Sequence, residues 1–184
     1  MSTTTNNKLQ SRYAGITLEG HPHALTAWFV IALRFVMGGM MLFAGISKYT
    51  GDGFNAGGYL ANVPATSPVS GLYATMAGNA MMLDVINVMI PATQVLIGLA
   101  LILGVFVRLA ALGGALQMAM FYLGGWEGEW LGLFDSTLIY MVVFLAIGAF
   151  AAGRIMGLDR YIEQVEIGGV PLIERYPKLG YLLG

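Results

Sequence analysis

The sequence predicts an all-α membrane protein, built as an antiparallel bundle of four transmembrane helices. Hydrophobic residues make up 57% of the 184 positions and charged residues only 10%, whereas soluble domains carry about 25% charged residues. The mean hydropathy is +0.72. The apolar residues also fall in long runs, and a helix of about 20 such residues crosses a bilayer core. These observations argue against a water-soluble globule.

Four runs meet the length requirement, and each predicts one transmembrane helix. They are residues 24–48, 83–106, 109–126 and 133–153. Together they define a single membrane domain over residues 24–153. A polar segment, residues 1–23, precedes it and is expected in the cytoplasm. It lacks the apolar region of a cleavable signal peptide, so the first hydrophobic helix is expected to direct insertion. Residues 154–184 form a second cytoplasmic segment.

The connections between the predicted helices differ in length. Gly104 and Arg108 indicate a tight turn between the second and third helices, which favours an antiparallel hairpin over one very long helix. Residues 49–82 form a connection much longer than the usual loop of about 4–6 residues. We expect this outer loop to hold two short interfacial helices and to fold over the mouth of the bundle as a lid. Residues 158–165 repeat apolar side chains at helical spacing, which predicts a C-terminal amphipathic helix on the inner membrane surface.

Lysine and arginine are distributed unevenly between the two predicted sides of the membrane. Cytoplasmic loops of membrane proteins carry an excess of these residues. With four spans, Lys48 lies on the outer side and Arg34 lies within the membrane. The other seven lie on the inner side: Lys8, Arg12, Arg108, Arg154, Arg160, Arg175 and Lys178. The asymmetry predicts that both termini are cytoplasmic.

Small residues are concentrated where the predicted helices should touch. Lipid tails do not drive apolar helices together, so close approach of their backbones must do so, and glycine permits it. We predict helix packing at Gly38, Gly45, Gly113, Gly114 and Gly153.

Arg34 is the one charged residue deep inside a predicted helix. It lies roughly 12–15 Å from the inner face at 1.5 Å per residue, at the depth expected for Gln117 on the third helix, and Gln94 lies near the middle of the second. Three interpretations are open. Arg34 can tie helices together by donating to backbone carbonyls, Gln117 or Gln94; it can donate to a quinone carbonyl or a bound anion; or it can extend to the inner surface.

A second polar set gathers toward the outer face. Its members are Lys48, Tyr49, Asp52, Asp84 and Asp135. Asp84 and Asp135 lie at the expected starts of helices, where the helix dipole stabilises a carboxylate. An ion-pair network around Lys48 is the competing interpretation.

Several kinds of chemistry lack the residues that they need. The sequence has no cysteine, which removes thiolate metal sites and iron–sulfur clusters. No histidine occurs within a predicted span, so a bis-histidine haem is excluded, and we predict no metal site. His21 and His23 are two ligands at most. No nucleophile–base pair or paired carboxylate marks a catalytic site. The net charge of −1 and the lack of a basic cluster argue against a nucleic-acid partner.

Three stretches resemble the DoxX/DoxD family of small membrane proteins. "RFVMGGMMLFAGISKY" is similar to the first helix of that family, in which Arg34, Gly38, Gly45 and Lys48 match an arginine, a glycine and a closing Gly-x-x-Lys. "PATQVLIGLALILGVFVRLAALGGALQM" resembles the second and third helices, and "LFDSTLIYMVVFLAIGAFAAGRIMGLD" resembles the fourth. The resemblance covers about residues 32–159. Many family members have glutamate where this chain has Gln94, so the resemblance does not imply a proton-carrying side chain at that position.

The resemblance implies a function in quinone-linked redox chemistry. The family is similar to small subunits of archaeal terminal quinol oxidase and of thiosulfate:quinone oxidoreductase, which implies the plasma membrane of a prokaryote, a redox partner subunit and a quinone within the bundle. Because this chain offers no haem or cluster ligands, electrons would come from the partner. Two alternatives remain: a non-catalytic scaffold or assembly partner for a soluble redox protein, and a small permease, which would require a homo-oligomer.

Overall fold

The computed structural model describes residues 9–13, 16–20, 25–51, 53–167 and 169–184. The described chain is mostly helical. Four apolar helices form the bundle: α1 (Thr26–Thr50), α4 (Ala80–Leu103), α5 (Val107–Gly124) and α6 (Ser136–Ala149). Ahead of them, β1 (Leu9–Tyr13) pairs with β2 (Ile16–Gly20) as an antiparallel hairpin, an element that the sequence analysis did not anticipate.

Three of these helices are long and apolar enough to cross a membrane. They are α1, α4 and α5, with 25, 24 and 18 residues. The fourth, α6, is apolar but has only 14 residues, or about 21 Å of helix, against a hydrocarbon core of about 30 Å. The predicted helix over 133–153 is therefore too long. Its last residues form irregular turns, in which Ala151 and Met156 adopt positive φ angles of 49° and 53°.

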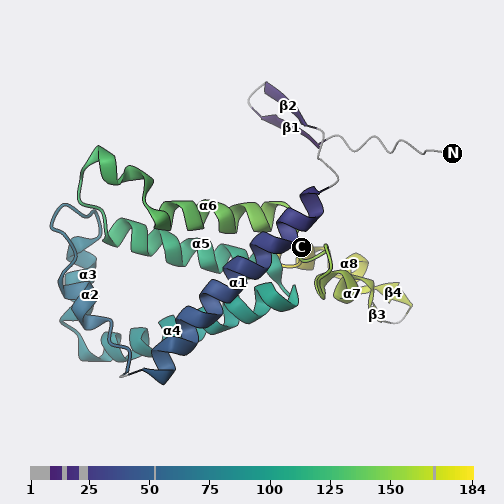
Figure 1. Ribbon diagram of the computed structural model, residues 1–184. Coiled ribbons are helices and arrows are strands. Elements are labelled where there is room, and N and C mark those ends of the chain that lie inside the picture. Colours follow the sequence, from purple (N-terminus) through teal and green to yellow (C-terminus); the bar gives the residue numbers. More distant parts are fainter. Residues whose placement is uncertain (1–8, 14–15, 21–24, 52, 168) are drawn as a thin grey trace.

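The four helices form two pairs that diverge. Along most of its length α1 packs against α4, and α5 packs against α6. The pairs meet where a short turn connects α4 to α5, and they separate toward the opposite end of the molecule (Figure 1). We call these the turn end and the loop end. At the loop end the space between the pairs holds α2 (Gly57–Ala61) and α3 (Ser70–Ala77).

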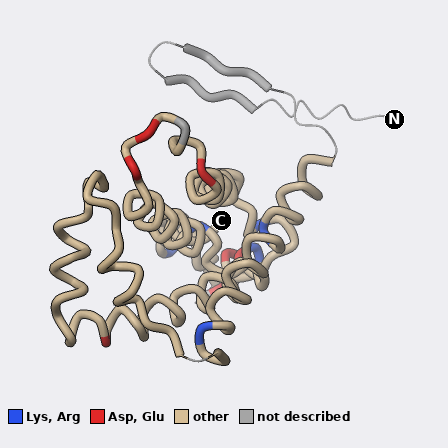
Figure 2. The backbone as a smooth tube through the Cα atoms, turned by 60° about the vertical axis from the view of Figure 1, so that its left-hand side comes forward, with Lys and Arg blue, Asp and Glu red and all other residues tan. Residues whose placement is uncertain are grey.

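The connection from α1 to α4 thus contains two short helices, as predicted. The turn from α4 to α5 is as tight as the sequence indicated, with Gly104 in the left-handed region at φ 70°, where glycine has no steric penalty. Charged residues are sparse along the long helices and gather at their ends and in the loops (Figure 2).

Glycines bring the paired helices into close contact. A Cβ atom on Gly98 of α4 would lie 2.7 Å from the Cα atom of Leu42 on α1, and one on Gly45 would lie 2.9 Å from the carbonyl oxygen of Pro91. Between α5 and α6, a Cβ on Gly114 would meet the ring of Phe144 at 2.7 Å. These distances are too short for any larger residue without movement of the backbone or of a buried ring.

The other glycines selected from the sequence lie in different surroundings. A Cβ on Gly38 of α1 would lie 3.1 Å from the carbonyl oxygen of Gly98 and 3.1 Å from the Cβ atom of Leu101, both on α4. A Cβ on Gly113 would make only ordinary contact with Ile97, at 3.4 Å. Gly153 follows α6 and lies against the C-terminal segment, where a Cβ would collide with Gly184 and Asp159.

The C-terminal segment contains the helix that was predicted over residues 158–165, but this helix ends at Gln164 and accounts for only part of the segment. The segment folds as five short elements: α7 (Asp159–Gln164), β3 (Glu166–Ile167), β4 (Val170–Pro171), α8 (Leu172–Arg175) and the 3₁₀ helix η2 (Pro177–Tyr181). Pro171, Pro177 and Gly169, with its φ of 79°, interrupt the helical pattern. A further 3₁₀ helix, η1 (Trp130–Phe134), precedes α6.

Candidate functional site

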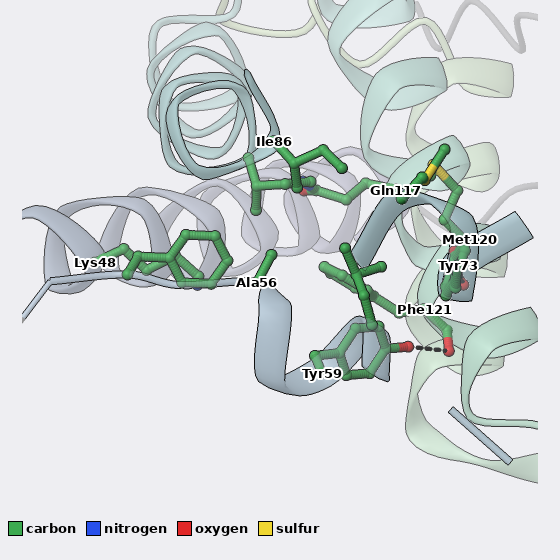
Figure 3. Close-up of a pocket in the computed structure, with 12 residues that line it drawn as sticks. Lys48, Ala56, Tyr59, Tyr73, Ile86, Gln117, Met120 and Phe121 are labelled. Carbon is green, nitrogen blue, oxygen red and sulfur yellow. Dashed lines mark hydrogen bonds between the residues drawn. The ribbon is translucent and has the colours of Figure 1, made fainter. Parts of the chain in front are cut away.

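A cavity of about 290 Å³ lies between the helix pairs at the loop end, beneath α2 and α3 (Figure 3). Typical ligand pockets begin near 300 Å³, so the cavity has room for one substituted ring. Its polar lining residues are Lys48 of α1, Gln117 of α5 and two tyrosines, Tyr59 and Tyr73, whose hydroxyls donate to backbone carbonyls. The remaining lining residues are apolar: Phe54, Ala56, Leu60, Met76, Ile86, Ile90, Met120 and Phe121.

Lys48 belongs to the last turn of α1 and is half-buried. Its Nζ atom donates to the carbonyl oxygen of Ala44 at 3.0 Å and lies 5.4 Å from the centre of the Phe54 ring. An ammonium group over an aromatic face is attracted by the ring quadrupole. Within the described chain the one salt bridge joins Arg154 to Glu163. The ammonium group therefore has unused donors beside an apolar cavity.

The expected ion-pair network around Lys48 is not formed by the acidic residues that the structure describes. Asp84 is exposed and lies in the second turn of α4, because that helix begins at Ala80. The N-cap of α4 is Asn79, whose side chain accepts from the Met82 amide at 3.1 Å. Asp135 is the N-cap of α6 and accepts from the Leu138 amide at 2.9 Å. Tyr49 is exposed, and Asp52 lies outside the described residues.

Gln117 and Gln94 are both buried, with 6% and 3% of their surface exposed. Each Oε1 atom has no hydrogen-bond donor among the described residues. Counted from the turn between α4 and α5, the two side chains lie at a similar depth, about 14–15 Å along their helices. Gln117 lines the cavity and Gln94 does not. Buried polar atoms without a partner are rare enough in proteins that each needs an explanation.

Arg34 lies away from the cavity, and only 1% of its surface is exposed. Its Nη1 atom donates to the carbonyl oxygens of Ala152 at 2.6 Å and Ile155 at 3.0 Å, and Nη2 donates to Met156 at 3.2 Å. These carbonyls belong to the irregular turns after α6. Of the three interpretations, the geometry favours the tie to backbone carbonyls; neither glutamine is a partner of the guanidinium in the described chain.

Asp159 completes this arrangement and was not selected from the sequence. Its carboxylate is fully buried and accepts from the amides of Phe106 at 2.7 Å and Val107 at 3.0 Å, at the start of α5, and from that of Gly184 at 3.0 Å. It thus caps a helix 53 residues earlier in the chain. The one sequence signal is its place in the Gly-Leu-Asp that closes the matched stretch. We call Arg34, Asp159 and their partners the turn-end clasp.

The loop that carries α2 and α3 is hydrogen-bonded to the end of α5. The Tyr73 hydroxyl donates to the carbonyl oxygen of Met120 at 2.9 Å, Ser67 Oγ donates to that of Leu123 at 2.6 Å, and Tyr59 donates to that of Phe121 at 3.3 Å. The carbonyls of Phe121 and Leu123 also accept from the amides of Gly125 and Trp126, so the hydroxyls add second hydrogen bonds that hold the loop against the end of α5. Burial raises the pKa of Tyr59 and of Tyr73 above that of an exposed tyrosine.

The same loop is also fixed to α4, because the amide of Ala56 donates to Asn87 Oδ1 at 2.8 Å. The loop therefore bridges the two diverging helix pairs and forms the roof of the cavity. Its aromatic residues were not selected from the sequence, where single tyrosines in a glycine-rich loop carry no distinct signal.

The comparison with protein families places these features in context. The family model described as DoxX matches residues 29–125, a range that contains α4, α5, nearly all of α1 and every residue that lines the cavity. This chain belongs to the DoxX family. No curated protein and no solved structure matches the DoxX chain. The family and the apolar helices together identify an integral membrane protein.

Proposed function

We propose that this DoxX protein is the membrane subunit of a quinone-linked redox complex, of the quinol oxidase or thiosulfate:quinone oxidoreductase type, and that the cavity at its loop end holds the quinone ring. The observation that carries the proposal is the cavity itself: apolar walls of ring size with one ammonium group and one amide. A quinone is a flat apolar ring with two polar oxygens, and these walls match both parts.

Of the two cations in α1, Lys48 rather than Arg34 is available to bind a quinone. Arg34 uses its guanidinium on three carbonyls in the turn-end clasp, whereas Lys48 lines the cavity. Its ammonium group can donate to one quinone oxygen, and Gln117 approaches the cavity from another side (Figure 3). Charge-assisted hydrogen bonds are the stronger kind, so Lys48 is the main polar anchor.

The redox partner would supply the electrons, because the described part of the chain has no cluster of three or more metal-ligating side chains and the sequence has no cysteine. The chain then contributes binding and positioning of the quinone. The loop over α2 and α3 would act as the lid of the site.

We further propose that all four apolar helices cross the membrane, with both termini in the cytoplasm. The turn end carries Arg108, Arg154 and the basic residues of the C-terminal segment, and the loop end carries Glu127 and Glu129. This distribution supports a cytoplasmic turn end by the positive-inside rule. The quinone cavity would then lie toward the outer leaflet.

Titration of the purified DoxX protein with a short-tailed ubiquinone tests the function. We expect saturable binding, about tenfold weaker in Lys48→Met, which keeps the length of the side chain but removes a hydrogen bond from a charged group. Arg154→Gln is the matched control, because it removes a cation that lies outside the cavity lining, and it should bind like the parent. Binding that does not saturate, or that is unaffected in Lys48→Met, would contradict the proposal.

A scaffold for a soluble redox protein is the second candidate, and the C-terminal segment favours it. Tyr161 and Tyr181 of that segment are 67% and 79% exposed, although Asp159 and Leu183 anchor it to the bundle. Exposed tyrosines on an anchored segment suit a docking surface. Removal of residues 160–184 would abolish co-purification of a partner from native membranes if this function holds, and leave it intact if the partner binds elsewhere.

A further inference from the structure

Gln117 is the polar group at the cavity that still lacks a partner. Its Oε1 atom is a hydrogen-bond acceptor without a donor among the described residues, on a side chain with an exposed fraction of only 6%. The walls around it come from Ile86, Met120 and other apolar residues. Leaving a buried acceptor unpaired is costly, so a ligand that brings a donor to this position gains affinity.

The two redox forms of a quinone differ in this respect. The oxidised form has two carbonyl oxygens, which only accept hydrogen bonds, whereas the reduced form has two hydroxyl groups, which also donate. The oxidised ring could accept from the amide hydrogens of Gln117 but would leave Oε1 of Gln117 unpaired. The reduced ring can donate a hydroxyl hydrogen to that atom. The last torsion of a glutamine side chain is soft, so the amide can turn its oxygen into the cavity.

We infer that the cavity selects the reduced, hydroxyl-bearing form of its ring ligand, and that Gln117 is the residue that determines this selectivity by accepting the hydroxyl hydrogen. The inference rests on the proposed function for the identity of the ring and adds the redox form. Lys48 does not favour the hydroxyl-bearing form, because its ammonium group only donates and a quinone carbonyl accepts at least as well as a phenolic oxygen. A bridging water is a poorer explanation, because a buried water needs two to four polar partners.

The experiment compares tetramethyl-1,4-benzoquinone with its hydroquinone, bound under anaerobic conditions to the full chain in detergent. We expect the hydroquinone to bind about tenfold more tightly. The midpoint potential of the bound couple would then shift by about 30 mV in the positive direction, since a tenfold ratio of affinities corresponds to 29.6 mV for two electrons.

Gln117→Leu isolates the residue. It should weaken hydroquinone binding about tenfold, leave binding of the oxidised quinone within about twofold, and abolish the shift in potential. This variant should also fold, because replacing a buried unpaired amide by an apolar side chain of similar size is neutral or stabilising. Gln94→Leu is the matched control: Gln94 is equally buried and also has an unpaired oxygen, but does not line the cavity. It should leave the ratio of affinities unchanged.

The outcomes separate the two proposals. Equal binding of both forms, or a ratio that Gln117→Leu does not alter, overturns the selectivity and leaves quinone binding intact. A ratio that Gln94→Leu reduces as much as Gln117→Leu does overturns the assignment to the cavity. Failure of both forms to bind overturns the proposed function, and the selectivity with it.

Discussion

Arg34 shows how one charged residue can be a structural requirement of a membrane bundle. Non-helical backbone at membrane depth is tolerated only where protein or water satisfies its polar groups. Under the proposed topology the turns after α6 are such a segment, and the guanidinium of Arg34 donates to the carbonyls of Ala152, Ile155 and Met156. Asp159 belongs to the same clasp but forms no salt bridge with the guanidinium within the described chain; its carboxylate accepts from backbone amides instead.

Replacing Arg34 should therefore harm stability rather than ligand binding. Arg34→Leu leaves three backbone carbonyls without their donor, and each buried acceptor left unpaired costs roughly 1–3 kcal/mol. We expect a large fall in the midpoint of thermal unfolding in detergent, with quinone affinity unchanged in the fraction that remains folded. Arg154→Leu, which breaks the exposed pair with Glu163, should cost less than about 1 kcal/mol. Equal effects of the two substitutions would contradict the role given to the clasp.

At the scale of elements, hydropathy located α1, α4 and α5 to within about three residues at each end, because length and composition determine which helices can lie in lipid. The same reasoning failed after residue 149, where the run remains apolar but Ala151 and Met156 turn the chain. Nothing local in "FAAGRIM" marks those turns. They depend on Arg34, which lies 118 residues earlier than Ala152, and a contact at that separation is not visible in the local pattern.

The candidate site was predictable only in part for the same reason. Lys48 and Gln117 were selected because polar residues in apolar helices are conspicuous, but their common cavity depends on the divergence of the helix pairs. Tyr59 and Tyr73 could not be selected, because their importance comes from hydrogen bonds to α5. Asp159 looked like a residue of the cytoplasmic tail, whereas its partners are the amides at the start of α5.

The loop that bridges the helix pairs should loosen in alkali. Burial raises the pKa of Tyr59 and Tyr73, so both stay protonated in the folded protein at a pH where the unfolded chain, with a tyrosine pKa of about 10, has begun to lose protons. The unfolded state then binds fewer protons than the folded state, and stability falls as the pH rises above about 10 and through the folded pKa. Below a pH of about 10 the contribution is fully present.

Spectrophotometric titration of tyrosinate measures this effect. The parent should show two late-titrating tyrosines, and Tyr73→Phe should remove one of them while lowering the free energy of unfolding by about 0.5–1.5 kcal/mol for the lost hydrogen bond to Met120. Tyr49→Phe is the control, because Tyr49 is 57% exposed and its loss should leave the late fraction unchanged. Late titration that persists in full in Tyr73→Phe would refute the assignment.

At the scale of the whole molecule, the question is whether α6 completes a fourth crossing. The helix alone covers about 21 Å of a core of about 30 Å, but the irregular residues 150–157 continue it to the turn end, where the clasp satisfies their carbonyls. We therefore predict that Glu129, before α6, and Arg160, after it, lie on opposite sides of the membrane. A chain in which α6 stays at one surface would place both on the same side.

The lack of cysteine in the sequence makes this prediction simple to test, because each introduced thiol is unique. Glu129→Cys and Ala65→Cys, both at exposed positions of the loop end, should react with a membrane-impermeant maleimide added to intact cells. Arg160→Cys, also at an exposed position, should react only after the cells are opened.

Ala65 serves as the reference for the loop end, because α1 and α4 on either side of it are each long enough to span. If Glu129→Cys is protected while Ala65→Cys reacts, the loop before α6 does not lie on the same side of the membrane as the rest of the loop end. If Glu129→Cys and Arg160→Cys both react in intact cells, α6 does not span the membrane, and the C-terminal segment is not cytoplasmic.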